Sequence, residues 1–172
     1  LAALDRDGEG VTDLAIASSG YGSGAGAVRT YSGADGSLIS FATGPAYSQY
    51  GVAIANAGDQ NGDGKEDLFV GAPMANNNRG AVYVQSGSDG SVLRTVDSPV
   101  TFALFGTTVA ALGDIDGDGK KDFAVGSPGA RSGTINNAGK VSIVRSLDAA
   151  FVDKFGTATF SRFGQSLAPA AD

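Results

Sequence analysis

Residues 114–122, DIDGDGKKD, place acidic side chains at a spacing that suits a hard cation. Aspartate stands at the first, third, fifth and ninth positions, and glycine at the fourth and sixth. On a tightly curved loop, side chains two residues apart can converge on one point, and glycine permits the curve through positive φ. Calcium takes about six to eight oxygen ligands, and a backbone carbonyl at the seventh position adds to the side chains. The pattern therefore predicts a cation site built from oxygen ligands.

The pattern occurs three times along the chain. We name the copies acidic loop 1 (residues 5–13, DRDGEGVTD), acidic loop 2 (residues 59–67, DQNGDGKED) and acidic loop 3 (residues 114–122). A single copy would fit an ordinary turn, since DG and NG pairs mark turns. Three copies favour a cation, because the carboxylates of each loop would otherwise repel one another. Calcium is preferred to magnesium, which gives up its water reluctantly.

The acidic loops differ from the helix-flanked EF-hand at their closing residue. An EF-hand closes with a bidentate glutamate at position twelve. Here that position holds Ile16, Val70 or Val125, so the ninth residue must close the cage instead. An apolar segment follows directly, which predicts a calcium loop within a β-hairpin.

Composition excludes several classes of site and partner. The 172 residues contain no cysteine and no histidine, so thiolate and imidazole ligands or nucleophiles are absent. A net charge of −6 argues against nucleic-acid binding, which needs clustered Lys and Arg. No apolar run is long enough to cross a membrane. With no GxSxG or phosphate-binding loop either, we expect a protein that is not an enzyme, and the scattered Ser, Lys and Tyr residues fit surface or packing roles.

The acidic loops belong to a repeat of about 55 residues, which predicts the architecture. Each unit has four short apolar segments separated by Gly, Asn and Asp turns, as in a four-stranded antiparallel meander. Such small sheets bury their faces by stacking radially, so we predict an all-β fold of β-propeller blades. The expected units are 1–49 (blade 1, its first strand truncated), 50–104 (blade 2), 105–162 (blade 3) and 163–172, the first strand of blade 4. Propellers have about four to eight blades, so a larger ring is expected.

Two further motifs complete a resemblance to a known family. Units open with aromatic-x-x-aromatic-Gly at 47–51, 102–106 and 160–164, and GAP at 71–73 becomes GSP at 126–128. Together with the acidic loops, these motifs resemble the FG-GAP repeat of integrin α-subunit β-propellers and their bacterial secreted relatives. The first unit departs from it, with ASS at 17–19 and no aromatic-Gly opening.

The resemblance implies a seven-bladed parent, calcium between the first two strands of each blade and an extracellular or cell-surface setting. A fourth calcium loop would begin at Asp172. Carried over by position, the ligands are Asp5, Asp7, Glu9 and Asp13; Asp59, Asn61, Asp63 and Asp67; and Asp114, Asp116, Asp118 and Asp122, with backbone carbonyls from Val11, Lys65 and Lys120.

The expected role of the metal is structural, because each acidic loop can fill its own cage, whereas a catalytic cation needs an open position. A ligand-binding surface is expected at the opposite end of the blades, where the loops vary in length and sequence. The plain alternative is a set of solvated loops, and the paired aromatics are expected to pack blade against blade. The candidate ligand-binding residues are Tyr21, Asn76, Asn77, Asn78, Arg79, Arg131, Asn136 and Asn137.

Three functions fit these expectations. The first is a calcium-stabilised extracellular adhesion or ligand-binding module, whose partners are the rest of the propeller, neighbouring subunits and a protein or glycan ligand. The second is a building block of a calcium-stiffened surface array or filament, since exposed strand edges invite partners. The third is an accessory or catalytic propeller of a secreted polysaccharide-active enzyme.

Overall fold

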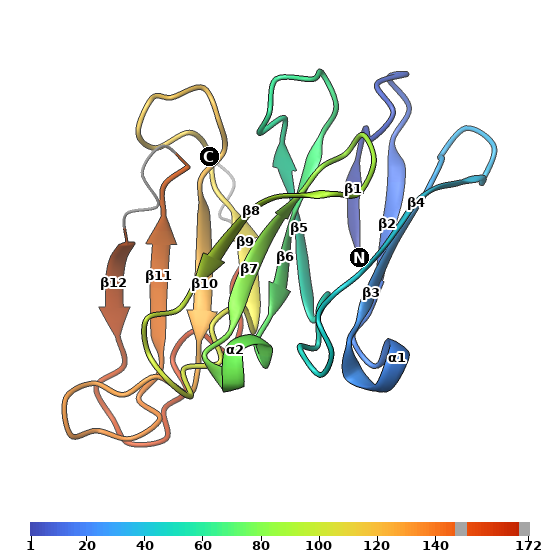
Figure 1. The fold of residues 1–172 in the computed structure, drawn as a ribbon. Coiled ribbons are helices and arrows are strands. Elements are labelled where there is room, and N and C mark those ends of the chain that lie inside the picture. Colours follow the sequence, from blue (N-terminus) through green and yellow to red (C-terminus); the bar gives the residue numbers. More distant parts are fainter. Residues whose placement is uncertain (147–150, 169–172) are drawn as a thin grey trace.

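The computed structural model describes residues 1–146 and 151–168 and contains three four-stranded antiparallel sheets (Figure 1). Within each sheet the strands follow chain order, so the predicted all-β class and meander topology are confirmed. The strands of blade 1 are β1 (Ala2–Leu4), β2 (Asp13–Ser18), β3 (Ala27–Tyr31) and β4 (Leu38–Thr43). Those of blade 2 are β5 (Ala53–Gly58), β6 (Asp67–Ala72), β7 (Ala81–Gln85) and β8 (Val92–Asp97). Those of blade 3 are β9 (Thr108–Ala111), β10 (Phe123–Ser127), β11 (Lys140–Val144) and β12 (Phe151–Phe155).

The three sheets pack face to face, and the first strand of each blade lies beside the first strand of the next (Figure 1). One apolar cluster fills the space between blades 1 and 2 and includes Val28, Tyr50 and Val70. A second cluster lies between blades 2 and 3, where the rings of Phe69 and Phe123 are 4.3 Å apart. Because blade 2 is covered on both faces, all six residues of β6 are buried, whereas the first four residues of β2 alternate between buried and exposed.

The aromatic-Gly turns join consecutive blades. A parallel bridge connects Gly26 to Tyr50, and the same bridge recurs twice, from Gly80 to Phe105 and from Gly139 to Phe163. The third of these bridges begins the fourth unit, which continues beyond the described residues at 168. The three sheets lie within the expected units, whose limits stay a prediction.

The two members of each aromatic pair have different environments. The second aromatic is buried in two turns, with Tyr50 2% and Phe105 0% exposed. The first is exposed in all three, at 71% for Tyr47, 67% for Phe102 and 66% for Phe160. The expectation that both members pack between blades is therefore wrong for the first member. Its backbone has positive φ in all three turns.

The loops after the second strands of blades 1 and 2 contain short turns that the sequence did not indicate. These are α1 (Tyr21–Gly24) and α2 (Ala75–Asn78), each four residues long. Both contain residues in the left-handed region, which glycine and asparagine tolerate best. They are tight turns at the end of the blades opposite to the acidic loops (Figure 1). In the described ranges, no helix is long and apolar enough to cross a membrane.

Candidate metal centre

The first aspartate of each acidic loop folds back over the loop and shapes it. In acidic loop 3, Asp114 accepts hydrogen bonds from the amides of Gly117 and Gly119, both at 2.7 Å. Asp5 accepts the equivalent pair in acidic loop 1 at 2.8 and 2.9 Å. Asp59 accepts the equivalent pair in acidic loop 2 at 2.7 and 2.8 Å. Loss of solvent is the largest single effect on the pKa of Asp59 and raises it, but the backbone hydrogen bonds together outweigh it, so the pKa is lowered. The loop curvature that the glycines permit is thus held by this side chain.

The ninth aspartate of each loop is buried and ties the loop to another turn of its own blade. One carboxylate oxygen accepts the amide of the second loop residue at 2.7 Å in all three blades. The other accepts an amide from the turn between the third and fourth strands, at 3.0 Å in blade 1 and 2.7 Å in blades 2 and 3. The aspartates are Asp13, Asp67 and Asp122, and the turn residues are Gly33, Gly87 and Ser146. The ninth position therefore braces the blade as well as facing the loop.

Three carboxylates converge in two of the three loops. Among the described residues, ligand atoms lie within 4.8 Å of one another for Asp5, Asp7 and Asp13, and for Asp114, Asp116 and Asp122. These are the first, third and ninth positions of acidic loops 1 and 3. Acidic loop 2 forms no such group of acidic side chains, because Asn61 holds the third position and donates to Asp63 at 3.0 Å.

Asp116 supplies the observation that bears on whether a cation fits. Both of its carboxylate oxygens are buried and have no hydrogen-bond partner within the described ranges. Loss of solvent raises its pKa above the ordinary value, and the charges of Asp118 and Asp122 raise it further. The nearby backbone amide of Asp118 acts in the opposite direction but does not form a hydrogen bond of ordinary geometry. A buried, unpartnered carboxylate is costly unless a positive charge faces it. The residues of acidic loop 3 therefore fit a bound divalent cation.

Side chains at the fifth position lie outside the two converging groups. Asp118 accepts the hydroxyl of Ser146 at 2.6 Å and the amide of Lys120 at 2.9 Å, and the Ser146 bond is the main cause of its lowered pKa. Glu9 is exposed, and the charge of Asp7 is the main cause of its raised pKa. Ligation by the fifth-position side chains and by the seventh-position carbonyls stays a prediction.

Contacts between neighbouring blades place further residues beside the loops. The buried Arg6 reaches from acidic loop 1 into blade 2, where Nε donates to the carbonyl of Gly87 at 3.0 Å and another guanidinium nitrogen donates to that of Ser86. Gln60, at the same loop position, donates to the carbonyl of Lys121 in blade 3 at 3.0 Å. Sequence reasoning missed this bridging position, because Arg, Gln and Ile occupy it in turn and show no repeat.

The eighth position bridges in the opposite direction. The Glu66 carboxylate of acidic loop 2 accepts the amide of Asp5 at 2.7 Å and the side-chain amide of Asn56 at 2.9 Å. Arg94, on β8, donates to the carbonyl of Ser146 in blade 3 at 2.6 Å. Desolvation lowers the pKa of Arg94, while the charges of Asp118 and Asp122 act in the opposite direction. Each acidic loop thus depends on a neighbouring blade for part of its surroundings.

The candidate ligand-binding residues lie at the opposite end of the blades (Figure 1). Tyr21 is 42% exposed, and its ring packs against Phe41 and beneath the guanidinium of Arg29. Asn76 donates to Asp97 on β8 at 2.6 Å, which holds it in place.

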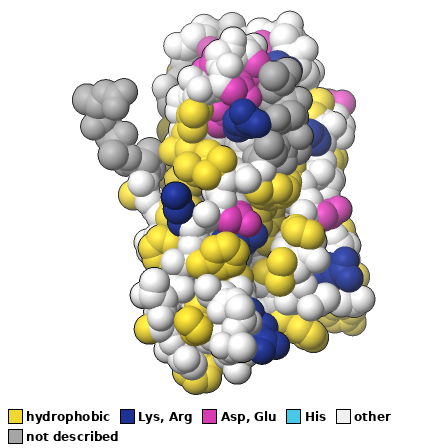
Figure 2. Space-filling model, turned by 90° about the vertical axis from the view of Figure 1, so that its left-hand side faces the viewer, with side chains coloured by type: hydrophobic (Ala, Val, Ile, Leu, Met, Phe, Trp, Pro, Cys, Tyr) yellow, Lys and Arg dark blue, Asp and Glu magenta, His cyan; other side chains and the backbone are white. Residues whose placement is uncertain are grey.

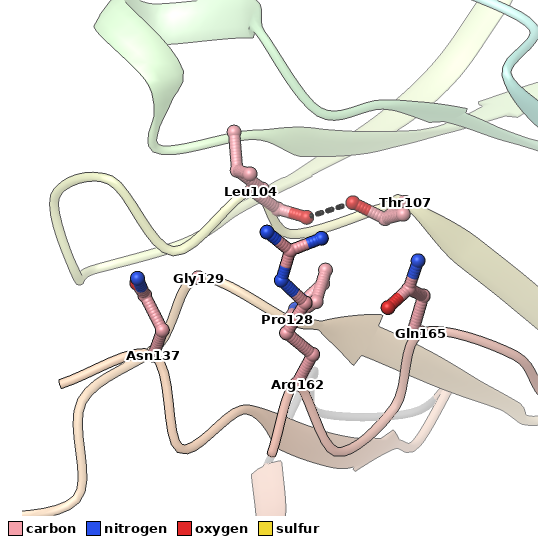
Figure 3. A pocket seen from close by; sticks show the side chains of 7 residues that line it. All are labelled: Leu104, Thr107, Pro128, Gly129, Asn137, Arg162 and Gln165. Atoms are coloured by element: carbon pink, nitrogen blue, oxygen red, sulfur yellow. Dashed lines mark hydrogen bonds between the residues drawn. The ribbon is translucent and has the colours of Figure 1, made fainter. Parts of the chain in front are cut away.

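The remaining candidates share the same end. Asn77, Arg79, Arg131 and Asn136 are exposed, while Asn78 and Asn137 are half-buried. Only Asn137 among the eight lines a described cavity, which also contains Arg162 (Figure 3). Sequence reasoning did not single out Arg162, because its importance depends on the packing of three separate segments.

The fold and the acidic loops define a class of protein: β-propeller blades with an acidic loop between the first and second strands. The FG-GAP repeat model matches residues 50–84 and 105–144, which contain acidic loops 2 and 3. The chain carries FG-GAP repeats and is an integrin α-like β-propeller segment.

Comparison with curated proteins gives the same assignment. Integrin alpha-11 from Homo sapiens is 30% identical over 145 residues, which are 75% of this chain and 12% of that protein. Integrin alpha-3 from Cricetulus griseus is 35% identical over 140 residues, 72% of this chain and 13% of that protein. Integrin alpha pat-2 from Caenorhabditis elegans is 36% identical over 109 residues, 58% of this chain and 9% of that protein. The chain therefore spans only a small part of these relatives.

Proposed function

We propose that this chain is a calcium-stabilised segment of an extracellular, adhesion-type β-propeller that acts by binding and not by catalysis. The observation that carries the proposal is the buried, unpartnered carboxylate of Asp116 within one of the two converging acidic groups. The similarity to integrin alpha chains supports the extracellular setting and the adhesion role.

The metal sites in this proposal draw on all three acidic loops. Acidic loops 1 and 3 would hold calcium through their first, third and ninth residues, and acidic loop 2 would hold it more weakly through Asp59, Asn61, Asp63 and Asp67. A bound calcium ion would neutralise the clustered carboxylates and hold the first two strands of each blade together. The ninth aspartate would also restrain the turn after the third strand, because its carboxylate accepts hydrogen bonds from both the acidic loop and that turn.

The binding role belongs to the opposite end, where the loops differ between blades. Partners in this proposal are the rest of a propeller, a neighbouring subunit and a protein ligand. A surface array is the second candidate. It is favoured by the apolar outer face of blade 1, where Leu14, Ile16 and Phe41 are 38%, 43% and 44% exposed.

Calcium removal tests the metal part of the proposal. We expect the melting temperature to fall when the protein is treated with a chelator and to recover with calcium more than with an equal concentration of magnesium. A ligand at a hundred times its dissociation constant stabilises by about 2.7 kcal/mol per site. Calorimetry with metal analysis measures both effects, and an unchanged melting curve in protein shown to lack metal would contradict the calcium sites.

The adhesion role has a separate test. The calcium-loaded protein should bind partners on an extracellular protein array, and a chelator should weaken that binding. Absence of binding on protein and glycan arrays, together with concentration-dependent assembly in sedimentation, would favour the surface array instead.

A further inference from the structure

A cavity of about 290 Å³ lies in blade 3, at the end opposite to the acidic loops (Figure 3). Two successive aromatic-Gly turns form two of its walls, and the loop after β10 forms the third. Its lining residues are Leu104, Thr107, Pro128, Gly129, Asn137, Arg162 and Gln165. We name it the Arg162 cavity.

The charge in the Arg162 cavity is specific to this junction between units. The amide of Arg162 donates to the carbonyl of Asn137 at 3.1 Å, and the amides of Leu104 and Gln49 make the same bond one and two units earlier. These bonds make the three residues structural equivalents. Of the three, only Arg162 carries a charge, so the repeat itself does not require a charged side chain at this position.

The space in the cavity is also specific to this junction. The amide of Gly129 donates to the carbonyl of Ala103, as the amide of Met74 donates to that of Ser48 in the preceding unit. Where blade 2 has a methionine side chain, blade 3 therefore has none. A Cβ at Gly129 would lie 2.3 Å from the carbonyl oxygen of Phe102, so the backbone approach there requires glycine.

The Arg162 guanidinium is placed to receive a ligand. Figure 3 shows it between Asn137 and Gln165 and directed toward Leu104. Across residues 1–146 and 151–168 it makes no hydrogen bond or ion pair. Its backbone has a φ of 50°, held by the bond to Asn137 and by the amide of Gln165, which donates to the Arg162 carbonyl at 3.1 Å. These bonds fix the backbone of Arg162, and the residue is exposed, so its guanidinium is accessible to a ligand.

The segments around the cavity contain no acidic residue, and two of the three carry Lys or Arg in an otherwise acidic chain. Residues 98–113, 128–146 and 154–168 contain no Asp or Glu, although the whole chain has 18. On the face shown in Figure 2, acidic side chains gather toward one end, a few lie near the middle, and the other end shows Lys, Arg and hydrophobic side chains. The acidic residues next to these segments are engaged, since Asp97 accepts from Asn76 and Asp153 pairs with Lys140. Among the described residues no carboxylate lines the cavity, so an anionic ligand would meet none there.

We propose that the Arg162 cavity binds the carboxylate of an aspartate or glutamate side chain in a protein ligand. Arg162 forms a two-point contact with the carboxylate, and the side-chain amides of Asn137 and Gln165 supply further donors. The volume lies at the lower end of the range for small-molecule pockets and is large enough for one acidic side chain. No aromatic ring lines the cavity, which favours a peptide side chain over the ring of an acidic sugar. This inference deepens the binding role proposed above and rests on it.

The test uses the calcium-loaded full chain and N-acetyl-glutamate methylamide as the probe, followed by two-dimensional NMR. We expect saturable shifts of the amide signals of Thr107, Gly129 and Gln165, and none with the glutamine analogue. Arg162→Gln should weaken binding at least about tenfold, since a hydrogen bond to a charged group is lost. Arg162→Lys should keep part of the affinity, because it retains the charge without the planar fork.

Lys154→Gln is the matched control. It removes a positive charge from an exposed position of blade 3 that does not line the cavity, and it should leave the affinity within about twofold because exposed charges contribute little. Equal weakening by Lys154→Gln and Arg162→Gln would overturn the site, and tighter binding of glucuronate than of the glutamate probe would overturn the peptide assignment. A protein that binds array partners and calcium but not the glutamate probe refutes this inference alone. Loss of array binding as well refutes the proposed function.

Discussion

At the scale of single residues, the acidic loops combine two kinds of aspartate. The first and ninth positions accept several backbone hydrogen bonds that shape the loop. The third position of acidic loop 3 does not, since Asp116 has no hydrogen-bond partner in the described part of the chain. Its charge is therefore useful only when a cation is present.

Asp116→Asn should change stability in opposite directions with and without calcium. Asp116 has a raised pKa when folded, so its own contribution to the stability of the metal-free protein is present below the ordinary aspartate pKa and is lost as pH rises through the folded pKa. Removing the charge should therefore raise the melting temperature of the metal-free protein at neutral pH. The same change should weaken calcium binding by roughly tenfold or more, because the charge of the ligands sets affinity. Calorimetry and calcium titration measure the two effects.

Asp35→Asn is the control for Asp116→Asn. Asp35 lies in the exposed turn after β3 and accepts the amide of Ser37, a bond that an asparagine oxygen also accepts. Calcium affinity should be unchanged in this variant. A metal-free Asp116→Asn protein that melts lower than the unmodified chain would contradict the proposed charge repulsion.

At the scale of elements, the aromatic-Gly turn is where two blades approach most closely. Gly106 has a φ of 90°, and a Cβ there would lie 2.5 Å from the carbonyl oxygen of Ala81 and 3.1 Å from the amide nitrogen of Ala72. Phe105, the residue before it, is fully buried between blades 2 and 3. The motif thus combines a buried anchor with a residue that allows backbone contact.

Gly106→Ala should destabilise the fold by roughly 3 kcal/mol, because it adds left-handed strain to a clash with backbone atoms. Gly113→Ala is the matched control, since a Cβ at that position meets no atom within 4 Å and its φ is not in the left-handed region. Urea unfolding measures both variants. Similar midpoints for the two would show that the backbone approach at Gly106 is not a structural requirement.

At the scale of the whole molecule, side chains from one blade complete the next. Arg6 in blade 1 is fully buried and donates to Thr30 of its own blade at 3.0 Å and to two carbonyls of blade 2. Burial lowers its pKa, while the charges of Asp67, Asp89 and Asp13 act in the opposite direction. A buried arginine in this position makes the packing of blade 1 on blade 2 specific as well as apolar.

Arg6→Met should lower the free energy of unfolding by about 3 kcal/mol, because it leaves buried acceptors without donors while keeping much of the side-chain volume. Blade 1 should also exchange its amide hydrogens faster than blades 2 and 3. Arg79→Met, at an exposed position, should change stability by no more than about 0.5 kcal/mol. Uniform exchange across all three blades in Arg6→Met would contradict a role in holding blade 1.

The features that could be predicted from the sequence are those that repeat in every unit. The 55-residue repeat, the four segments in each unit and the acidic loops predicted the all-β class and the meander, since strand patterns and turn residues are short-range signals. The first, third and ninth loop positions were also recognisable, and acidic loops 1 and 3 bring them together. Because these features recur at equivalent positions in each unit, they can be distinguished from patterns that occur by chance.

Contacts between distant segments were decided by the tertiary structure alone. Arg6, Glu66 and Arg94 act across blade boundaries, and nothing in their sequence neighbourhood indicates which backbone atoms they meet. The exposure of Phe102 beside the burial of Phe105 accompanies positive φ at the first of them, which no residue type signals. The Arg162 cavity arises because Gly129 and Arg162 depart from the repeat at positions that only folding brings together. The repeated pattern therefore determines the scaffold, whereas the effect of a single departure from the repeat depends on which residues the fold brings into contact with it.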